Sequence, residues 1–156
     1  MQHAVVGFFV KDRRVCLPLK LKGFGAGNQN GYGGRIEDGE TEEEALFREI
    51  KEESGLDVRG AKITKVAIII TFFGEEPKFV LHIFLIEDWV GELKASEEMG
   101  EPEWFFFEEI PFDRMWVADK KWLPQILEGV KLRAVIRFST DGKRVDRFDP
   151  FEVEQF

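Results

Sequence analysis

The sequence predicts an α/β (α+β) sandwich, in which a mixed β-sheet carries helices on its faces. Runs rich in β-branched and aromatic residues recur along the chain, and turn signals separate them. Two other segments, residues 42–54 and 119–129, have the pattern of helices. No linker or repeat interrupts the 156 residues, so we expect one domain over residues 1–156.

Six segments are expected to form the sheet, and most of them come in pairs. Residues 132–148 form a closing hairpin, for which Asp141-Gly142 is the turn signal. Pro18 cannot donate to a strand ladder, so it places the second strand near a sheet edge. The expected strand segments are residues 4–10, 14–21, 63–73, 78–89 and 104–110, together with the hairpin.

Composition limits the location and the partners of the chain. Cys16 is the single cysteine, which excludes an intramolecular disulfide and suits a reducing compartment. The first residues look like a strand rather than a signal peptide, and no apolar run is long enough to span a bilayer. We therefore expect a cytoplasmic protein without a membrane partner. His3 and His82 lack metal-ligand spacing and are expected to be structural or surface residues.

The net charge of −8 argues against polymeric nucleic acid as a partner. A small anionic ligand remains compatible with it, because clustered carboxylates bind divalent cations and these bind phosphates. Six of the twelve residues from Gly23 to Gly34 are glycines. Such a loop lets the backbone approach a ligand closely, and a flexible connection is the alternative interpretation.

The helix at residues 42–54 has clear local signals at both ends. Thr41 is a good N-cap, and Glu44 three residues later completes a capping box. Acidic residues in the first turn suit the helix dipole, and Gly55 stands where the helix should end. An apolar stripe for docking on the sheet consists of Leu46, Phe47 and Ile50.

The second half of this helix carries carboxylates that repel one another. Glu49, Glu52 and Glu53 stand at i, i+3 and i+4 and project from one face. Hard divalent cations such as Mg²⁺ take oxygen ligands of this kind, whereas a solvated acidic face is the alternative. Arg48 can pair with Glu52 or with Glu40 and so orient a carboxylate.

The spacing of these residues identifies the chain as similar to a known family. Gly34, Glu40, Arg48-Glu49-Ile50, Glu52-Glu53 and Gly55-Leu56 reproduce the whole Nudix box, GX5EX7REUXEEXGU, over residues 34–56. The resemblance implies an α/β/α sandwich that cleaves a nucleoside diphosphate linked to another moiety. It also implies Mg²⁺ as cofactor, with Mn²⁺ as a substitute. The metal ligands that it implies are Glu49, Glu52, Glu53, the Gly33 carbonyl and Glu98.

Outside the box, the stretches at residues 22–34 and 97–127 resemble the MutT-like members of the family that act on oxidised purine nucleoside triphosphates. The resemblance assigns Asn30 and a Trp-x-x-Asp element, Trp116 with Asp119, to holding the purine. The chemistry of these side chains fits purine binding, because an amide and a carboxyl group can hydrogen-bond to the edge of a base and tryptophan can stack on its face. Alternatives from the residues alone are an αL turn for Asn30, a core position for Trp116 and an N-cap for Asp119.

Further pocket residues and two departures follow from the same resemblance. It assigns Phe24 and Gly34 to substrate binding and Lys20 to the polyphosphate. One departure is Ala118, which stands where these relatives have a second aspartate, and we expect a narrower or shifted purine selectivity. The other is Ile70, which replaces an aromatic pocket residue. Phe72 lies two residues on and is expected on the same face.

We therefore expect a monomeric hydrolase that binds a small purine nucleoside triphosphate. The expected substrates are 8-oxo-dGTP and 2-oxo-dATP, and the expected products are monophosphate and pyrophosphate, which sanitises the nucleotide pool. Catalytic roles fall to Glu49, Arg48 and Lys20, and the general base is Glu52, Glu98 or Glu49. Alternatives are another Nudix activity, on ADP-ribose, dinucleoside polyphosphates or unmodified triphosphates, and a silent nucleotide sensor.

Overall fold

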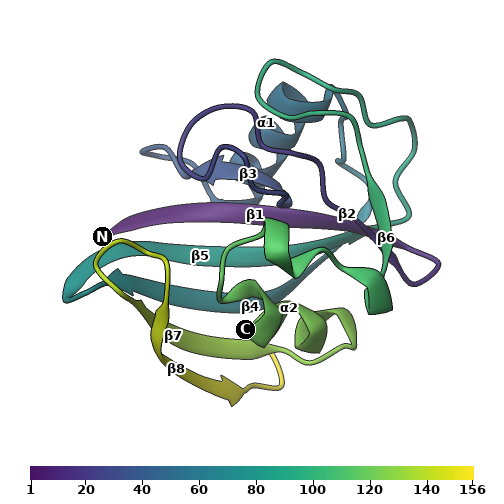
Figure 1. The fold of residues 1–156 in the computed structure, drawn as a ribbon. Coiled ribbons are helices and arrows are strands. Elements are labelled where there is room, and N and C mark those ends of the chain that lie inside the picture. The colour runs from purple at the N-terminus through teal and green to yellow at the C-terminus, as the bar shows by residue number, and fades with distance from the viewer.

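The structure, a computed structural model, describes residues 1–156 and is built around one eight-stranded sheet (Figure 1). The strand order is β6-β2-β1-β5-β4-β7-β8, and β3 pairs with β1 beside this path. The elements are β1 Gln2–Lys11, β2 Arg14–Cys16, β3 Tyr32–Arg35, α1 Glu42–Ser54, β4 Lys62–Phe73, β5 Glu76–Glu87, β6 Trp104–Phe106, the 3₁₀ turns Phe107–Glu109 and Phe112–Arg114, α2 Asp119–Leu127, β7 Leu132–Phe138 and β8 Val145–Glu152.

The two helices cover opposite faces of the sheet, which confirms the predicted fold class. In Figure 1, α1 lies beside β3, and α2 lies in front of β4 and β7. Two separate apolar clusters form as a result. Leu46 and Ile50 of α1 pack with Val5 of β1, whereas Leu123 of α2 packs with Ile69 of β4. Each cluster removes apolar surface from water, which is the main stabilising contribution to the fold.

The first hairpin is tighter, and its second strand shorter, than predicted. Lys11 pairs with Arg14 across a two-residue turn, in which Asp12 and Arg13 both have positive φ of 52° and 57°. This is the turn geometry that matches the twist of paired strands. The second strand ends at Cys16, so Pro18 lies beyond it. β2 is the second strand from the sheet edge, because β6 pairs with its outer side.

Both helices begin at the first residue of the predicted segments, Glu42 and Asp119, but only α1 has a side-chain cap. Thr41 accepts the Glu44 amide, and the Glu44 carboxylate accepts the Thr41 amide, while Gly55 ends the helix with φ of 76°. In α2 the N-cap is Ala118, and Asp119 is the first helical residue, so the N-cap interpretation of Asp119 is wrong. No helix is long and apolar enough to span a membrane.

A polar network joins the start of α1 to the sheet on the α1 side. Lys65 of β4 donates to Glu42 (Nζ to Oε1, 2.6 Å) and to His82 Nδ1 (3.0 Å). Because Nδ1 is an acceptor there, His82 carries its proton on Nε2, which lies 2.9 Å from His3 Nδ1. His82 is only 7% exposed, and burial lowers its pKa to about 4, while Glu42 opposes the shift.

We expect this histidine to make the fold sensitive to acid. An unfolded histidine titrates near 6.5, so the stability linked to neutral His82 is complete above that pH and is lost as pH falls toward 4. The loss should reach roughly 2–3 kcal/mol. Urea unfolding of the wild type and of His82→Gln at pH 7.5 and 4.5 tests this. The difference between the two proteins should change with pH, and a constant difference would contradict the assignment.

Candidate active site

One cavity of about 290 Å³ opens between β1, β4, β5 and the segment before α2. Its wall includes polar groups that the sequence predicted, namely Lys20, Asn30, Gly33, Gly34, Glu53 and Asp119. It also includes aromatic side chains, namely Phe24, Phe73, Phe79, Trp116, Trp122 and Phe138. Binding sites for small ligands commonly combine an apolar wall with a few convergent polar groups.

Three predicted carboxylates lie close together and form the acidic cluster, of which Glu53 lines the cavity. Glu49 and Glu53 of α1 and Glu98 of the loop before β6 each place an oxygen within 4.8 Å of the others. The fourth, Glu52, is not part of the acidic cluster. Its side chain is half exposed, and its Oε1 lies 3.6 Å from Arg48 Nη1. Of the three carboxylates at i, i+3 and i+4, the structure therefore brings Glu49 and Glu53 together, whereas Glu52 lies near Arg48.

The two α1 carboxylates of the acidic cluster are hard to ionise without a cation. Burial raises the pKa of Glu53 to about 8, and Glu49 and Glu98 add to the shift. The Gly33 amide opposes it by donating to Glu53 Oε1 at 2.8 Å. Burial also raises the pKa of Glu49, against the effect of Arg48. A divalent cation bound by carboxylate oxygens would favour both ionised forms.

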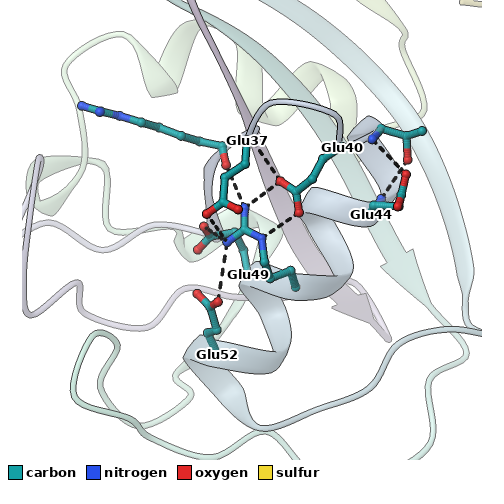
Figure 2. Close-up of polar contacts among 8 residues, drawn as sticks. Glu37, Glu40, Glu44, Glu49 and Glu52 are labelled. Atoms are coloured by element: carbon teal, nitrogen blue, oxygen red, sulfur yellow. Dashed lines mark hydrogen bonds and ion pairs between the residues drawn. The ribbon is translucent and has the colours of Figure 1, made fainter.

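Arg48 orients the Glu49 carboxylate, and of its two predicted partners, Glu40 and Glu52, it hydrogen-bonds to Glu40. Its Nε and Nη2 donate to the two Glu40 oxygens at 2.7 and 2.9 Å, and its Nη1 donates to Glu49 at 2.8 Å. Figure 2 shows Glu37, Glu40, Glu49 and Glu52 gathered around this one guanidinium group. The guanidinium lowers the pKa of Glu40 to about 2, so this carboxylate stays ionised.

Gly33, just before the box, and Gly34, its first residue, both approach other groups closely. A Cβ on Gly33 would lie 1.9 Å from the Val5 carbonyl oxygen, and one on Gly34 would lie 2.5 Å from the Glu49 carboxylate. Gly33 therefore fits only as glycine against the β1 backbone. At Gly34 the neighbour is the end of a flexible side chain, which can move at a small energetic cost.

We expect Gly34→Ala to fold but to lose activity. The added methyl group should push Glu49 away from Glu53 and Glu98, and misplacement of a catalytic group by about 1 Å can cost on the order of 100-fold in rate. The measurement is kcat beside the melting temperature, which should change little. A variant with wild-type kcat would show that the position of Glu49 does not matter.

Two aromatic side chains of the cavity wall, Phe24 and Trp116, stack on each other and lie outside the core clusters. The Phe24 and Trp116 rings lie 5.1 Å apart with an interplanar angle of 21°. Phe24 is 48% exposed and also contacts Phe79. Trp116 lines the cavity and is not a member of either apolar cluster. Both rings therefore offer faces on which a flat base could stack.

The polar groups beside this stack differ in what they can still bind. Asp119 is 6% exposed, and burial raises its pKa to about 7 while the Trp116 backbone amide opposes the shift. It can therefore donate or accept near neutral pH. The Asn30 Oδ1 accepts the Gly31 amide at 2.8 Å, which leaves the Asn30 amino group for a ligand. Ala118 is 1% exposed within the apolar cluster of α2 and does not line the cavity.

The prediction for β4 was wrong by one residue. Ile70 and Phe72 do not line the cavity, whereas Thr71 and Phe73 do. Phe72 points to the opposite face, where the Arg137 guanidinium lies 4.3 Å from its ring centroid. The ladder with β5 also shifts register between positions 70 and 72. Other lining residues that the prediction missed are Phe79, Leu81, Met99, Trp122, Ile136 and Phe138.

The chain belongs to the Nudix family and is a Nudix hydrolase: the NUDIX domain matches residues 1–126. Its relatives include the oxidized purine nucleoside triphosphate hydrolase of Danio rerio, 41% identical over 83% of this chain and 81% of the relative. The enzyme of the same name from Mus musculus is 37% identical over 94% of this chain and 92% of its own length. Among solved structures, a MutT protein from Bacillus halodurans has a TM-score of 0.77 at 23% identity, covering 96% and 97% of the two chains.

Proposed function

We propose that this chain hydrolyses oxidised purine nucleoside triphosphates, such as 8-oxo-dGTP and 2-oxo-dATP, to monophosphate and pyrophosphate. The observation that carries the proposal is a single cavity lined both by Glu53 of the acidic cluster and by Trp116 with Asp119. A nucleotide of this class has a flat base, which Trp116 and Asp119 would bind, and a polyphosphate, which would lie at the acidic cluster. Its removal would sanitise the nucleotide pool, and the two relatives bear the name of this activity.

The acidic cluster fits a divalent cation, and we propose Mg²⁺, with Mn²⁺ as a substitute. Its oxygens come from Glu49, Glu53 and Glu98, and the Gly33 carbonyl and Glu52 are further proposed ligands. Hard oxygen donors and a buried, mutually repelling set of carboxylates suit such an ion. When bound, it supplies charge neutralisation for the polyphosphate and lowers the pKa of a water molecule.

The side chains have separate roles in this proposal. Arg48 orients Glu49, and Lys20 offers a point charge to the polyphosphate. Phe24 and Trp116 stack on the base, a contact worth roughly 1–3 kcal/mol, while Asn30 and Asp119 read its edge. Our first candidate for the group that takes the proton from water is Glu52, because it is half exposed and outside the acidic cluster. Glu98 and Glu49 are the alternatives.

Product analysis tests the reaction type. The chain is incubated with 8-oxo-dGTP and Mg²⁺, and the phosphorus products are separated and identified. We expect 8-oxo-dGMP and pyrophosphate in equal amounts, with EDTA stopping the reaction. Release of inorganic phosphate and a diphosphate would contradict the proposed cleavage. Binding without any product would favour the nucleotide sensor. The monomeric state and the cytoplasmic location stay predictions.

A further inference from the structure

Gln29 is a buried residue next to the base-reading side of the cavity, although it does not line the cavity itself. It is 1% exposed. Its Nε2 donates to the Leu17 carbonyl at 2.8 Å and to Glu103 Oε2 at 3.1 Å. Its backbone amide donates to the Arg114 carbonyl at 2.7 Å. One residue therefore joins its own loop to the chain at Leu17, Glu103 and Arg114.

Two of the segments that meet at Gln29, its own loop and the segment of Arg114, carry residues that we assign to the base. Gln29 directly precedes Asn30, whose own amide donates to the Pro18 carbonyl at 3.1 Å. Arg114 lies two residues before Trp116. The backbone amide of Gln29 therefore connects the loop that presents Asn30 to the segment that presents Trp116, and the Gln29 side chain anchors this junction to Leu17 and Glu103. A shift at Gln29 would change the spacing between these two side chains.

The orientation of the Gln29 amide is determined by its neighbours. Its Oε1 is buried and has no hydrogen-bond partner. Reversing the amide would place this oxygen against the Leu17 carbonyl and the Glu103 carboxylate, so that three acceptors would meet. A buried polar atom without a partner destabilises a fold. Gln29 therefore carries a cost in stability at Oε1, whereas an apolar side chain at this position would leave the Leu17 carbonyl without this donor.

We propose that Gln29, held by Glu103, is a positioning residue that sets the distance between Asn30 and Trp116 and thereby the discrimination between purine bases. This inference rests on the proposed function, because it takes Asn30 and Trp116 as the base-binding pair. Gln29 touches no reacting atom, so its effect should fall on binding of the base and not on the chemical step.

The test compares kinetic constants for 8-oxo-dGTP and dGTP in four variants. Gln29→Met keeps the length of the side chain and removes the donor. Glu103→Leu removes the acceptor at an exposed position, so this variant should fold even if the first does not. Glu103→Gln keeps an acceptor and should restore wild-type behaviour. Ser139→Ala is the matched control, because Ser139 is also buried and hydrogen-bonded but lies in the β7–β8 turn.

We expect Gln29→Met and Glu103→Leu to raise KM for 8-oxo-dGTP about five-fold and to lower the preference over dGTP by a similar factor. kcat should stay within about two-fold, as for an interaction made equally in ground and transition states. Ser139→Ala should lower only the melting temperature. The inference is overturned if Glu103→Leu leaves KM and preference unchanged, or if Ser139→Ala changes them equally.

The wild type, measured first, separates this inference from the proposed function. If it does not prefer 8-oxo-dGTP to dGTP, the proposed substrate is wrong. The role of Gln29 is then measured as the preference for the best purine nucleotide over dCTP. A fall of that preference in Glu103→Leu supports the positioning role, and an unchanged preference overturns it.

Discussion

Glu53→Gln is expected to lower kcat by at least about 100-fold while making the metal-free protein more stable, because it removes a cation ligand and a buried charge together. The glutamine oxygen can still accept the Gly33 amide, so the local fold should persist. The pKa of Glu53 is raised to about 8. The stability that its protonated form contributes is therefore complete below the ordinary pKa of 4.5 and is lost as pH rises toward 8.

The stability gain of Glu53→Gln should accordingly grow with pH and reach roughly 1–3 kcal/mol near pH 8. It is measured by urea unfolding in EDTA at pH 5.5 and 8. Glu43→Gln, at an exposed position in the first turn of α1, is the matched control and should change neither kcat nor stability markedly. Wild-type kcat in Glu53→Gln would remove this residue from the active site.

Asp119→Asn is expected to lower kcat/KM for the oxidised purine about 10- to 100-fold, because a site built to hydrogen-bond one base edge then presents the wrong donors and acceptors. The pKa of Asp119 is raised to about 7. In the wild type, kcat/KM should therefore change near pH 7, where the carboxyl group converts from donor to acceptor. The asparagine variant should lack this change.

Stability provides an independent check on Asp119. Because its pKa is raised by burial, the stability that its protonated form contributes is complete below the ordinary value of 3.8 and is lost as pH rises through 7. Asp119→Asn should therefore unfold at higher urea concentration than the wild type at pH 8, and the difference should be clearly smaller at pH 5. An identical pH profile of kcat/KM in both proteins would show that Asp119 does not read the base.

Local signals were sufficient to predict α1 to the residue. The Thr41–Glu44 capping box and Gly55 act within a single turn of chain, so no tertiary contact was needed to locate the ends. The acidic cluster was predicted less completely. Spacing places Cβ atoms on one face of a helix, but it does not decide which partner a long side chain contacts. Arg48 lies close to Glu52, whereas Glu98 comes from a distant loop that no periodicity can place.

The prediction of which β4 residues line the cavity was wrong for a different physical reason. Both faces of β4 are mostly apolar from Ile68 to Phe73, with Thr71 as the exception, so alternation does not distinguish the cavity face from the opposite face. A register shift between β4 and β5 in the same stretch makes the orientation of these side chains still harder to predict. The neighbouring strand β7 alternates clearly, with Arg133 and Arg137 on one face and Phe138 on the other. Pairing of Phe73 with Phe138 would have identified the correct face, but strand pairing is not readable from one sequence.

The most direct test of the proposed substrate is the ratio of kcat/KM for 8-oxo-dGTP to that for dGTP, measured with Mg²⁺ beside ADP-ribose and diadenosine polyphosphate. We predict that the oxidised triphosphate has the highest kcat/KM of the four and exceeds dGTP by at least about ten-fold, the ratio that one well-placed hydrogen bond provides. Equal values for 8-oxo-dGTP and dGTP, or a higher value for ADP-ribose, would contradict the proposed function and leave only a Nudix hydrolase of another specificity.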